Sequence, residues 1–232
     1  MIRSALVFAF LLLYVPPASV VGIVISHLTG SVGILYRLGR FGVRTALVLA
    51  RTRIVTSGLE HLAETRNTVV MPNHVSHLDA PVLFEVLGVD FKALVKAELF
   101  RLPFFGRVLL RAGFIPVHRE DKEKARLAVD AAIASLREGH CFLVFPEGTR
   151  SRTGALGDFR KGAFVAAVQA GSRILPVAVR GTRELMPRGG FRIRRGTVEV
   201  RVLDPLDAGS YSYDDRDRLL AEVRSRIAAA LS

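Results

Sequence analysis

The densest group of polar side chains in this 232-residue sequence lies in residues 73–79 and includes His74, Ser76 and Asp79. A continuous helix would turn His74 and Asp79 to different faces, so we expect His74 to precede a helix and Asp79 to lie in its first turn. From there the carboxylate reaches back to the imidazole. Such a pair fixes the ring's tautomer and makes its free nitrogen a base that can take a proton from an alcohol.

The same residues allow two other interpretations. Ser76 and Asp79 have the spacing of a capping box, in which the carboxylate serves only the start of the helix. His74, His77 and Asp79 could instead contribute ligands to a metal ion. We expect no metal, because no further cluster of ligand residues accompanies these three in the sequence.

A second polar group follows the apolar run at residues 141–145 and consists of Glu147, Gly148, Thr149 and Arg150. A glycine turn exposes backbone amides, and amide dipoles, hydroxyls and a guanidinium together suit an anion such as phosphate. The alternative is an ordinary turn after a strand with an arginine on the surface.

Further basic residues could extend this anion site. Arg160 and Lys161 begin ten residues after Arg150, and Arg119 comes just after the apolar residues 113–117, separated from them by His118. By position alone Arg119 is equally a solvated side chain.

The elements that must position these groups follow an α/β pattern from about residue 55 onward, with short apolar runs between amphipathic stretches. Open α/β sheets place their sites at the carboxyl ends of the strands, so the polar groups are expected to meet at one edge. The predicted strands are residues 68–71, 90–95, 113–117, 141–145, 174–179 and 198–202, and the predicted helices include residues 125–136 and 219–231.

The amino-terminal segment has the composition of a membrane anchor. Residues 4–36 contain no Asp, Glu, Lys or Arg. Pro16 and Pro17 interrupt this run, so we predict two helices, residues 4–15 and 18–36, with a bend between them. At about 18 Å and 28 Å, against a hydrocarbon core of about 30 Å, they fit a hairpin in one leaflet better than a span.

The charges around this hairpin place both of its ends on the cytoplasmic face of the cell membrane. Basic residues flank it, and no acidic residue precedes Glu60. A cleaved signal peptide and a buried pair of core helices are the alternatives. We therefore divide the chain into a membrane-associated hairpin with a basic linker, residues 1–52, and a catalytic α/β domain, residues 53–232.

Composition excludes several classes of protein. Half of the residues are hydrophobic, which excludes a disordered chain, and the single cysteine excludes a disulfide-stapled secreted fold. The net charge of +12 suits anionic lipids, phosphorylated substrates or nucleic acid. Because most of the basic residues are arginine in a chain rich in Ala, Val and Leu, part of this charge is typical of a GC-rich bacterial genome. We expect no nucleic-acid partner, since neither a binding motif nor aromatics interleaved with basic residues occur.

Taken together, the polar groups occur in a familiar order. Four segments resemble, in order, the four sequence blocks of the glycerolipid acyltransferases, specifically the 1-acylglycerol-3-phosphate acyltransferases. They are the H-x4-D pair His74 and Asp79, residues 113–119, residues 145–150 and residues 175–177. Residues 96–99, 103–106 and 159–162 are also similar to the segments between those blocks. The resemblance runs from about residue 58 to residue 206.

This resemblance implies a fold, an activity and roles for the residues. The fold is a mixed, largely parallel sheet flanked by helices, as in the glycerol-phosphate acyltransferases. His74 and Asp79 would form the catalytic pair, Arg119 and Arg150 would contact the acceptor's phosphate, and residues 147–149 would shape the pocket. His118 stands where the family usually has Asp, so the role of that position is open.

The expected reaction moves a fatty acyl group from acyl-CoA or acyl carrier protein to lysophosphatidic acid, forming phosphatidic acid without a resident cofactor. No Ser or Cys lies in a G-x-S-x-G context, which argues against an acyl-enzyme. The oxyanion donors are not identified; backbone amides, Lys96 and Lys161 are candidates. Another lysophospholipid acceptor, or a non-catalytic basic lipid-binding protein, remains an alternative.

Overall fold

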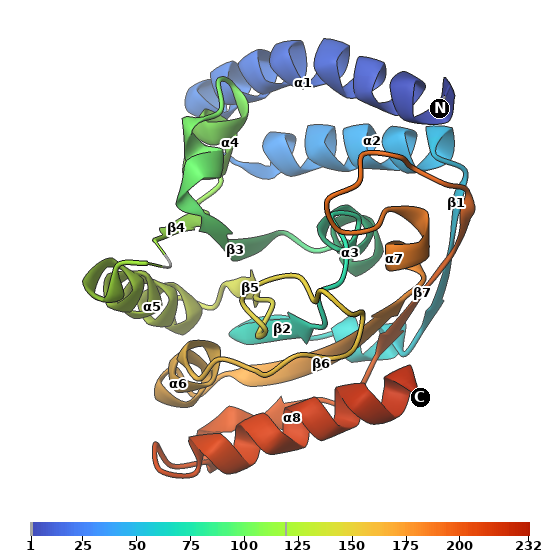
Figure 1. Ribbon diagram of the computed structural model, residues 1–232. Coiled ribbons are helices and arrows are strands. Elements are labelled where there is room, and N and C mark those ends of the chain that lie inside the picture. The colour runs from blue at the N-terminus through green and yellow to red at the C-terminus, as the bar shows by residue number, and fades with distance from the viewer. Residues whose placement is uncertain (1, 119) are drawn as a thin grey trace.

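The computed structural model describes residues 2–118 and 120–232 and shows a central mixed sheet between two layers of helices (Figure 1). The strands are β1 (Thr52–Ser57), β2 (Thr68–Pro72), β3 (Phe91–Lys96), β4 (Ile115–Val117), β5 (Cys141–Leu143), β6 (Arg173–Arg180), β7 (Gly196–Val202) and β8 (Leu206–Asp207). The helices are α1 (Ile2–Thr29), α2 (Gly33–Leu49), α3 (Asp79–Leu87), α4 (Phe105–Arg111), α5 (Lys122–Arg137), α6 (Gly162–Gln169), α7 (Thr182–Leu185) and α8 (Arg216–Leu231), with 3-10 turns at Leu59–Leu62, Ala97–Arg101 and Ala208–Ser210.

The sheet runs in the order β1-β7-β6-β2-β5-β3-β4, and β8 pairs with β6 outside this path. All pairs are parallel except β6 with β7 and β6 with β8. Every strand predicted from the sequence is present, and the predicted mixed, largely parallel sheet flanked by helices is confirmed. Strand β1 and the two-residue strand β8 were not predicted from the sequence. Strand β1 pairs with β7, which lies far along the chain, and no local pattern reveals such a contact.

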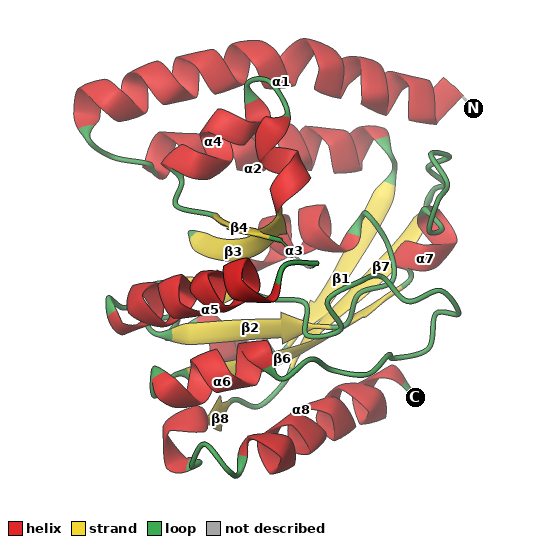
Figure 2. Cartoon of the chain, turned by 60° about the vertical axis from the view of Figure 1, so that its left-hand side comes forward, coloured by secondary structure: helices red, strands yellow, loops and turns green. Residues whose placement is uncertain are grey.

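Helices cover both faces of the sheet (Figures 1 and 2). On one face α3 packs under α2, with Val82 and Leu83 fully buried against strand residues such as Val70. On the other face α5, α6 and α8 bury Leu136, Phe164 and Leu219. Alternate residues of β2 point into the two cores, because successive side chains of a strand face opposite sides.

The predicted bend at Pro16 and Pro17 is wrong. Helix α1 runs unbroken through both prolines, and the turn to α2 comes at residues 30–32 instead of within the proline pair. The prolines remove two backbone donors, but α2 supports the helix on both sides of them. The Tyr14 hydroxyl donates to the Leu38 carbonyl oxygen at 2.9 Å, and Gly22 allows Leu35 to approach closely.

The two helices of this amino-terminal pair differ in their surroundings. Helix α1 is about 42 Å long and, among the described residues, is long and apolar enough to cross a membrane. Many of its large apolar side chains are exposed, among them Leu12 and Leu13 to 75% and 76%. Helix α2 is bound to the domain below it, since Arg44 donates to Glu85 and the Tyr36 hydroxyl donates to the Phe91 carbonyl oxygen at 2.8 Å.

Candidate active site

The end of strand β2 fixes the position of His74. The side chain of Asn73, which directly precedes it, is buried and makes two hydrogen bonds to Val179 on β6. Its amide nitrogen donates to the Val179 carbonyl oxygen at 3.0 Å, and its oxygen accepts from the Val179 backbone N–H at 2.7 Å. The chain therefore leaves the sheet at a defined point, with His74 at the carboxyl edge.

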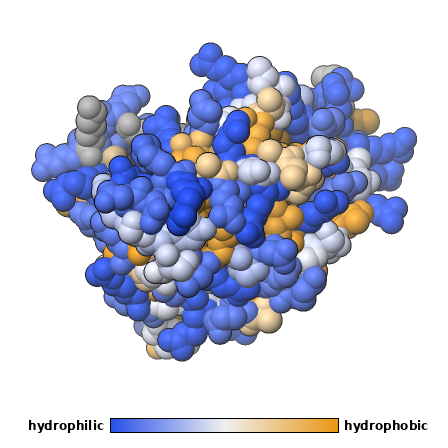
Figure 3. Space-filling view, turned by 90° about the horizontal axis from the view of Figure 1, so that it is seen from below, coloured by the Kyte–Doolittle hydropathy of each residue, from blue (hydrophilic) through white to orange (hydrophobic). Residues whose placement is uncertain are grey.

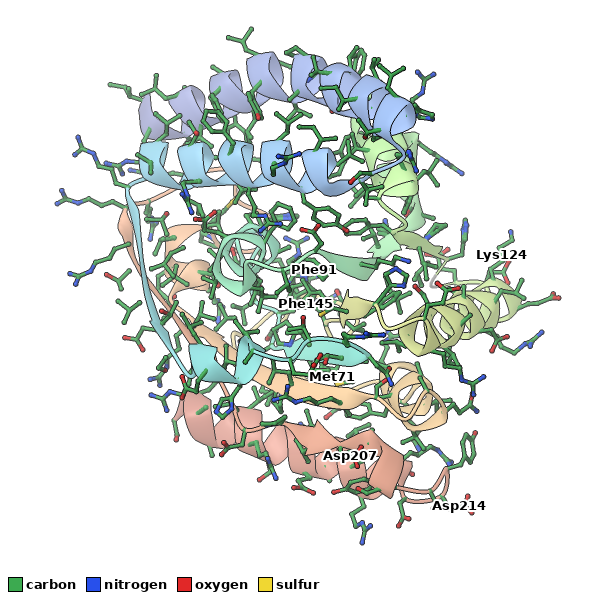
Figure 4. All side chains as sticks on the ribbon, turned by 180° about the vertical axis from the view of Figure 1, so that it is seen from behind. Met71, Phe91, Lys124, Phe145, Asp207 and Asp214 are labelled. Atoms are coloured by element: carbon green, nitrogen blue, oxygen red, sulfur yellow. The ribbon has the colours of Figure 1, made fainter. Side chains whose placement is uncertain are left out.

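His74 and Asp79 form the predicted pair. The Nδ1 atom of His74 lies 2.7 Å from Oδ2 of Asp79, whose carboxylate is fully buried, while the imidazole is 18% exposed. The ring also stacks on Phe145, with centroids 3.9 Å apart. Phe145 lies between Phe91 and Met71 in Figure 4. With Nδ1 on the carboxylate, Nε2 is the nitrogen available to a substrate.

The carboxylate of Asp79 also binds the backbone of the loop before helix α3. Its Oδ2 atom accepts from the backbone N–H groups of Val75 and Ser76 at 2.7 and 2.8 Å. Helix α3 begins at Asp79, with Leu78 as its N-cap residue and without a side-chain capping hydrogen bond, so these bonds hold the loop that precedes the helix. The Ser76 hydroxyl donates to the Met186 carbonyl oxygen at 2.7 Å.

Glu147 joins the loop after β5 to the backbone of His74. Its Oε1 atom accepts from the His74 N–H at 2.6 Å, and its Oε2 atom accepts from the Gly157 N–H at 2.9 Å. Burial raises the pKa of this carboxyl group, against the lowering effect of the two hydrogen bonds. Gly148 turns with φ of +69°, and a Cβ there would come within 2.7 Å of the Arg160 side chain.

Arg150 presents an unsatisfied donor. Its Nη1 atom is buried and has no hydrogen-bond partner among the described residues. Burial and the nearby guanidinium of Arg188 lower the pKa of Arg150. Two neighbouring cations with a free donor favour an anion between them, and planar guanidinium groups match phosphate oxygens.

Comparisons with known proteins agree with this geometry. Residues 53–180 match the acyltransferase family. The chain is 30% identical over 189 residues to the 1-acyl-sn-glycerol-3-phosphate acyltransferase of Borreliella burgdorferi, covering 82% of this chain and 76% of that relative. The chain belongs to the acyltransferase family.

Two further comparisons extend the similarity. The chloroplastic 1-acyl-sn-glycerol-3-phosphate acyltransferase LPAT1 of Arabidopsis thaliana is 34% identical over 181 residues, which is 77% of this chain and 49% of that relative. The crystal structure of the LPA acyltransferase PlsC from Thermotoga maritima superposes with a TM-score of 0.87 at 24% identity, covering 99% of this chain and 93% of that one. This superposition shows that the two chains share their fold over nearly their whole lengths.

The structure brings together only some of the residues predicted for the acyltransferase site. Thr149 is exposed on the turn beside Arg150, and Lys96 is half-exposed at the end of β3, 3.1 Å from Glu98. Lys161 pairs with Asp217 of α8 at 2.8 Å and makes no hydrogen bond or ion pair with His74 or Asp79. Arg119 lies outside the described residues.

The second histidine of the motif is placed differently from the first. His77 is exposed on the surface, yet partial burial of its ring lowers its pKa, and the nearby charge of Arg150 lowers it further. Among the described residues, no group of three or more His, Cys, Asp or Glu side chains is arranged to hold a metal ion.

Two residues of this site, Thr182 and Arg188, were not predicted from the sequence. Thr182 is fully buried and donates its hydroxyl hydrogen to Oδ1 of Asp79 at 2.5 Å, across 103 residues of sequence. Gly181 before it has φ of +88°, and a Cβ there would lie 2.3 Å from the Thr197 carbonyl oxygen. Arg188 donates to the Arg150 carbonyl oxygen at 2.8 Å. The only local signal in the sequence was Gly181 after a buried strand. A glycine there predicts a tight turn but does not show which distant residue the turn contacts.

Proposed function

We propose that this protein transfers a fatty acyl group from an acyl thioester to the sn-2 hydroxyl of 1-acylglycerol 3-phosphate, forming phosphatidic acid. The observation that carries this proposal is the His74–Asp79 pair at the same sheet edge as the unsatisfied guanidinium of Arg150. His74 can take a proton from a hydroxyl group, and Arg150 can bind a phosphate group. This arrangement matches an acceptor lipid that carries both a hydroxyl and a phosphate. The Borreliella and Arabidopsis relatives are both named 1-acyl-sn-glycerol-3-phosphate acyltransferases, which supports this acceptor.

In this reaction Nε2 of His74 takes the hydroxyl proton while the oxygen attacks the thioester carbonyl carbon. The ionised Asp79 stabilises the resulting imidazolium and holds the ring's orientation. The tetrahedral intermediate then collapses, the C–S bond breaks, and the thiolate leaves with the proton from His74. Acyl-CoA or acyl carrier protein supplies the thioester, and no resident cofactor takes part.

Direct transfer fits the nucleophiles that the fold provides. Burial raises the pKa of the Cys141 thiol to about 12, so that this buried group is protonated near neutral pH. The Ser76 hydroxyl is buried and donates to the Met186 carbonyl oxygen. An acyl-enzyme mechanism requires a nucleophile that a neighbouring base activates, and neither of these two groups has such a base.

A thioester-release assay on the purified protein tests the function. We expect release of free thiol from acyl-CoA or acyl carrier protein to depend on lysophosphatidic acid, and the lipid product to be phosphatidic acid. Faster turnover with a lysophospholipid that carries a head group would assign the site to that acceptor. Absence of acceptor-dependent release with every acceptor would instead favour a non-catalytic lipid-binding protein.

Thr182 acts as a positioning residue for Asp79 in this proposal. Thr182→Val has nearly the same shape but lacks the hydroxyl, so a buried carboxylate oxygen loses its donor. The free enzyme already bears most of the free-energy cost of leaving this carboxylate oxygen without a donor. We therefore expect kcat to fall by only about 5- to 10-fold, with the KM of both substrates nearly unchanged. Thr182→Ser should restore kcat, which a loss of packing alone would not predict. A Thr182→Val enzyme with wild-type kcat would remove Thr182 from this role.

We also propose that α1 anchors the enzyme in one leaflet at the cytoplasmic face of the cell membrane. The exposed side chains of α1 are apolar except for His27 and Thr29 near its end, and α2 lies between α1 and the sheet (Figure 2). Hydrophilic residues cover most of the face seen from below in Figure 3, the side on which Figure 1 shows α8.

Cysteine labelling tests this topology. The buried Cys141 thiol is expected to react slowly, so Arg3→Cys and Arg126→Cys can be compared in the otherwise unchanged chain. In a one-leaflet anchor, a membrane-impermeant maleimide should label both positions from the cytoplasmic side only. Labelling from opposite sides would show that α1 spans the bilayer.

A further inference from the structure

The loop between α7 and β7 is strongly basic and bears one exposed aromatic ring. Residues 187–195 contain four exposed arginines and no acidic residue: Arg188, Arg192, Arg194 and Arg195. Within residues 2–118 and 120–232, none of the four forms an ion pair. Phe191, between them, is 74% exposed. We refer to residues 187–195 as the basic strap.

One part of the basic strap is attached to the amino-terminal end of α1. The buried Ile193 N–H donates to the Ser4 hydroxyl oxygen at 2.9 Å. The Phe191 ring meets Phe8 edge to face, with centroids 6.3 Å apart. Leu6 on the same helix end is 53% exposed. The apolar surface of α1 therefore continues onto the strap and is bordered there by arginines.

The other part of the strap is attached to the active site. Arg188 donates to the backbone oxygen of Arg150 at 2.8 Å, and the Met186 carbonyl oxygen, directly before the strap, accepts from the Ser76 hydroxyl at 2.7 Å. The Arg194 N–H donates to the Leu185 carbonyl oxygen at 2.8 Å. These bonds fix the strap between the anchor and the residues around His74.

We propose that the basic strap binds the surface of an anionic lipid bilayer, with Phe191 among the upper acyl chains and Arg192, Arg194 and Arg195 on the lipid phosphates. This inference rests on the one-leaflet anchoring proposed above. Aromatic rings concentrate at the level of the headgroups, and basic side chains near the surface are attracted to anionic lipids. Guanidinium groups that lack protein carboxylates are free to bind such phosphates.

The sequence contains no tryptophan, so a single introduced tryptophan reports on its own position. The full-length Phe191→Trp enzyme is reconstituted into vesicles that contain brominated phosphatidylcholine. The bromine atoms should quench the fluorescence of the introduced tryptophan. Tyr213→Trp is the matched control, because Tyr213 is 52% exposed and lies next to α8, on the other side of the sheet from α1. It should keep the emission that it has in vesicles without bromine. Equal quenching at both positions, or none at position 191, would overturn the proposal.

A second arm tests the lipid charge. Adding phosphatidylglycerol to the brominated vesicles should increase quenching of Trp at position 191 by about twofold, and raised salt should reverse the increase. Replacing Arg192, Arg194 and Arg195 with Gln should abolish this increase, whereas Arg126→Gln with Arg201→Gln, on exposed residues outside the strap, should preserve it. Equal quenching in neutral and anionic vesicles would overturn the assignment of the arginines to lipid phosphates. If acyl-CoA in neutral detergent changed the emission of the tryptophan at position 191 and anionic vesicles did not, the three arginines would be assigned to the acyl donor.

Leu13→Trp on α1 separates failure of the strap from failure of the anchor. Leu13 is 76% exposed, and bromine should quench a tryptophan there if α1 lies in the bilayer. Quenching at position 13 without quenching at position 191 would leave the anchor in place and reject the strap. No quenching at either position would reject both.

Discussion

His74→Ala is expected to lower kcat by at least about 100-fold, because loss of a general base typically costs 10²- to 10⁴-fold. The Nδ1 atom of His74 is held 2.7 Å from the buried carboxylate of Asp79, which leaves Nε2 as the nitrogen that can take the hydroxyl proton. The measurement is steady-state thiol release at saturating donor and acceptor, with membrane binding and the unfolding transition checked in parallel.

His77→Ala is the matched control for this experiment. His77 is exposed, lies three residues further along the same motif, and makes no hydrogen bond to Asp79 among the described residues. Its variant should keep most of the wild-type kcat. A His74→Ala enzyme that retains more than about a hundredth of the wild-type kcat would contradict the proposed base. Asp79→Asn should lose less activity than His74→Ala, since the base itself remains. Full activity would restrict Asp79 to holding the loop before α3.

Arg150→Ala is expected to lower kcat/KM for lysophosphatidic acid by about 10- to 150-fold, which corresponds to the roughly 1.5 to 3 kcal/mol of a charge-assisted hydrogen bond. The buried Nη1 atom of Arg150 lacks a partner among the described residues, and the acceptor's phosphate carries close to two negative charges near pH 7. Because the phosphate also positions the attacking hydroxyl, kcat should fall together with a rise in the acceptor's KM. The KM of the donor should change little.

Two substitutions sharpen the interpretation of Arg150. Arg150→Lys should recover only part of the activity, since an ammonium group cannot bind two phosphate oxygens in the planar geometry of a guanidinium. Arg152→Ala, at an exposed arginine two residues away, should be close to wild type. Loss of donor affinity in Arg150→Ala, with unchanged acceptor kinetics, would move this residue to the phosphates of the thioester carrier.

Local patterns in the sequence were sufficient for the strands and for part of the site. Buried strands such as β5 and β6 are continuous apolar runs that end at turn residues, and this signal does not depend on distant parts of the chain. His74 and Asp79 could be paired for the same reason, because both lie in one short segment at the start of a helix. The family followed from the order of the motifs.

The amino-terminal helices show where local rules failed. Two adjacent prolines predict a break when the helix is considered alone. In the fold, α2 packs along α1 on both sides of the prolines, through Tyr14 and through the close contact at Gly22. The favourable contacts with a neighbouring helix outweigh the missing backbone hydrogen bonds, and these contacts are not visible in residues 4–36 alone.

The sequence by itself determined the elements, the motifs and the type of chemistry, since hydrophobic periodicity and short-range spacing are local properties of the chain. Only the tertiary structure decided which distant groups complete the site. Thr182 reaches Asp79, Glu147 reaches the backbone of His74, and Arg188 reaches Arg150. Each contact depends on the order in which β2, β5 and β6 lie side by side in the sheet. That order is set by burial of the whole core, which brings the carboxyl ends of strands far apart in sequence to one edge.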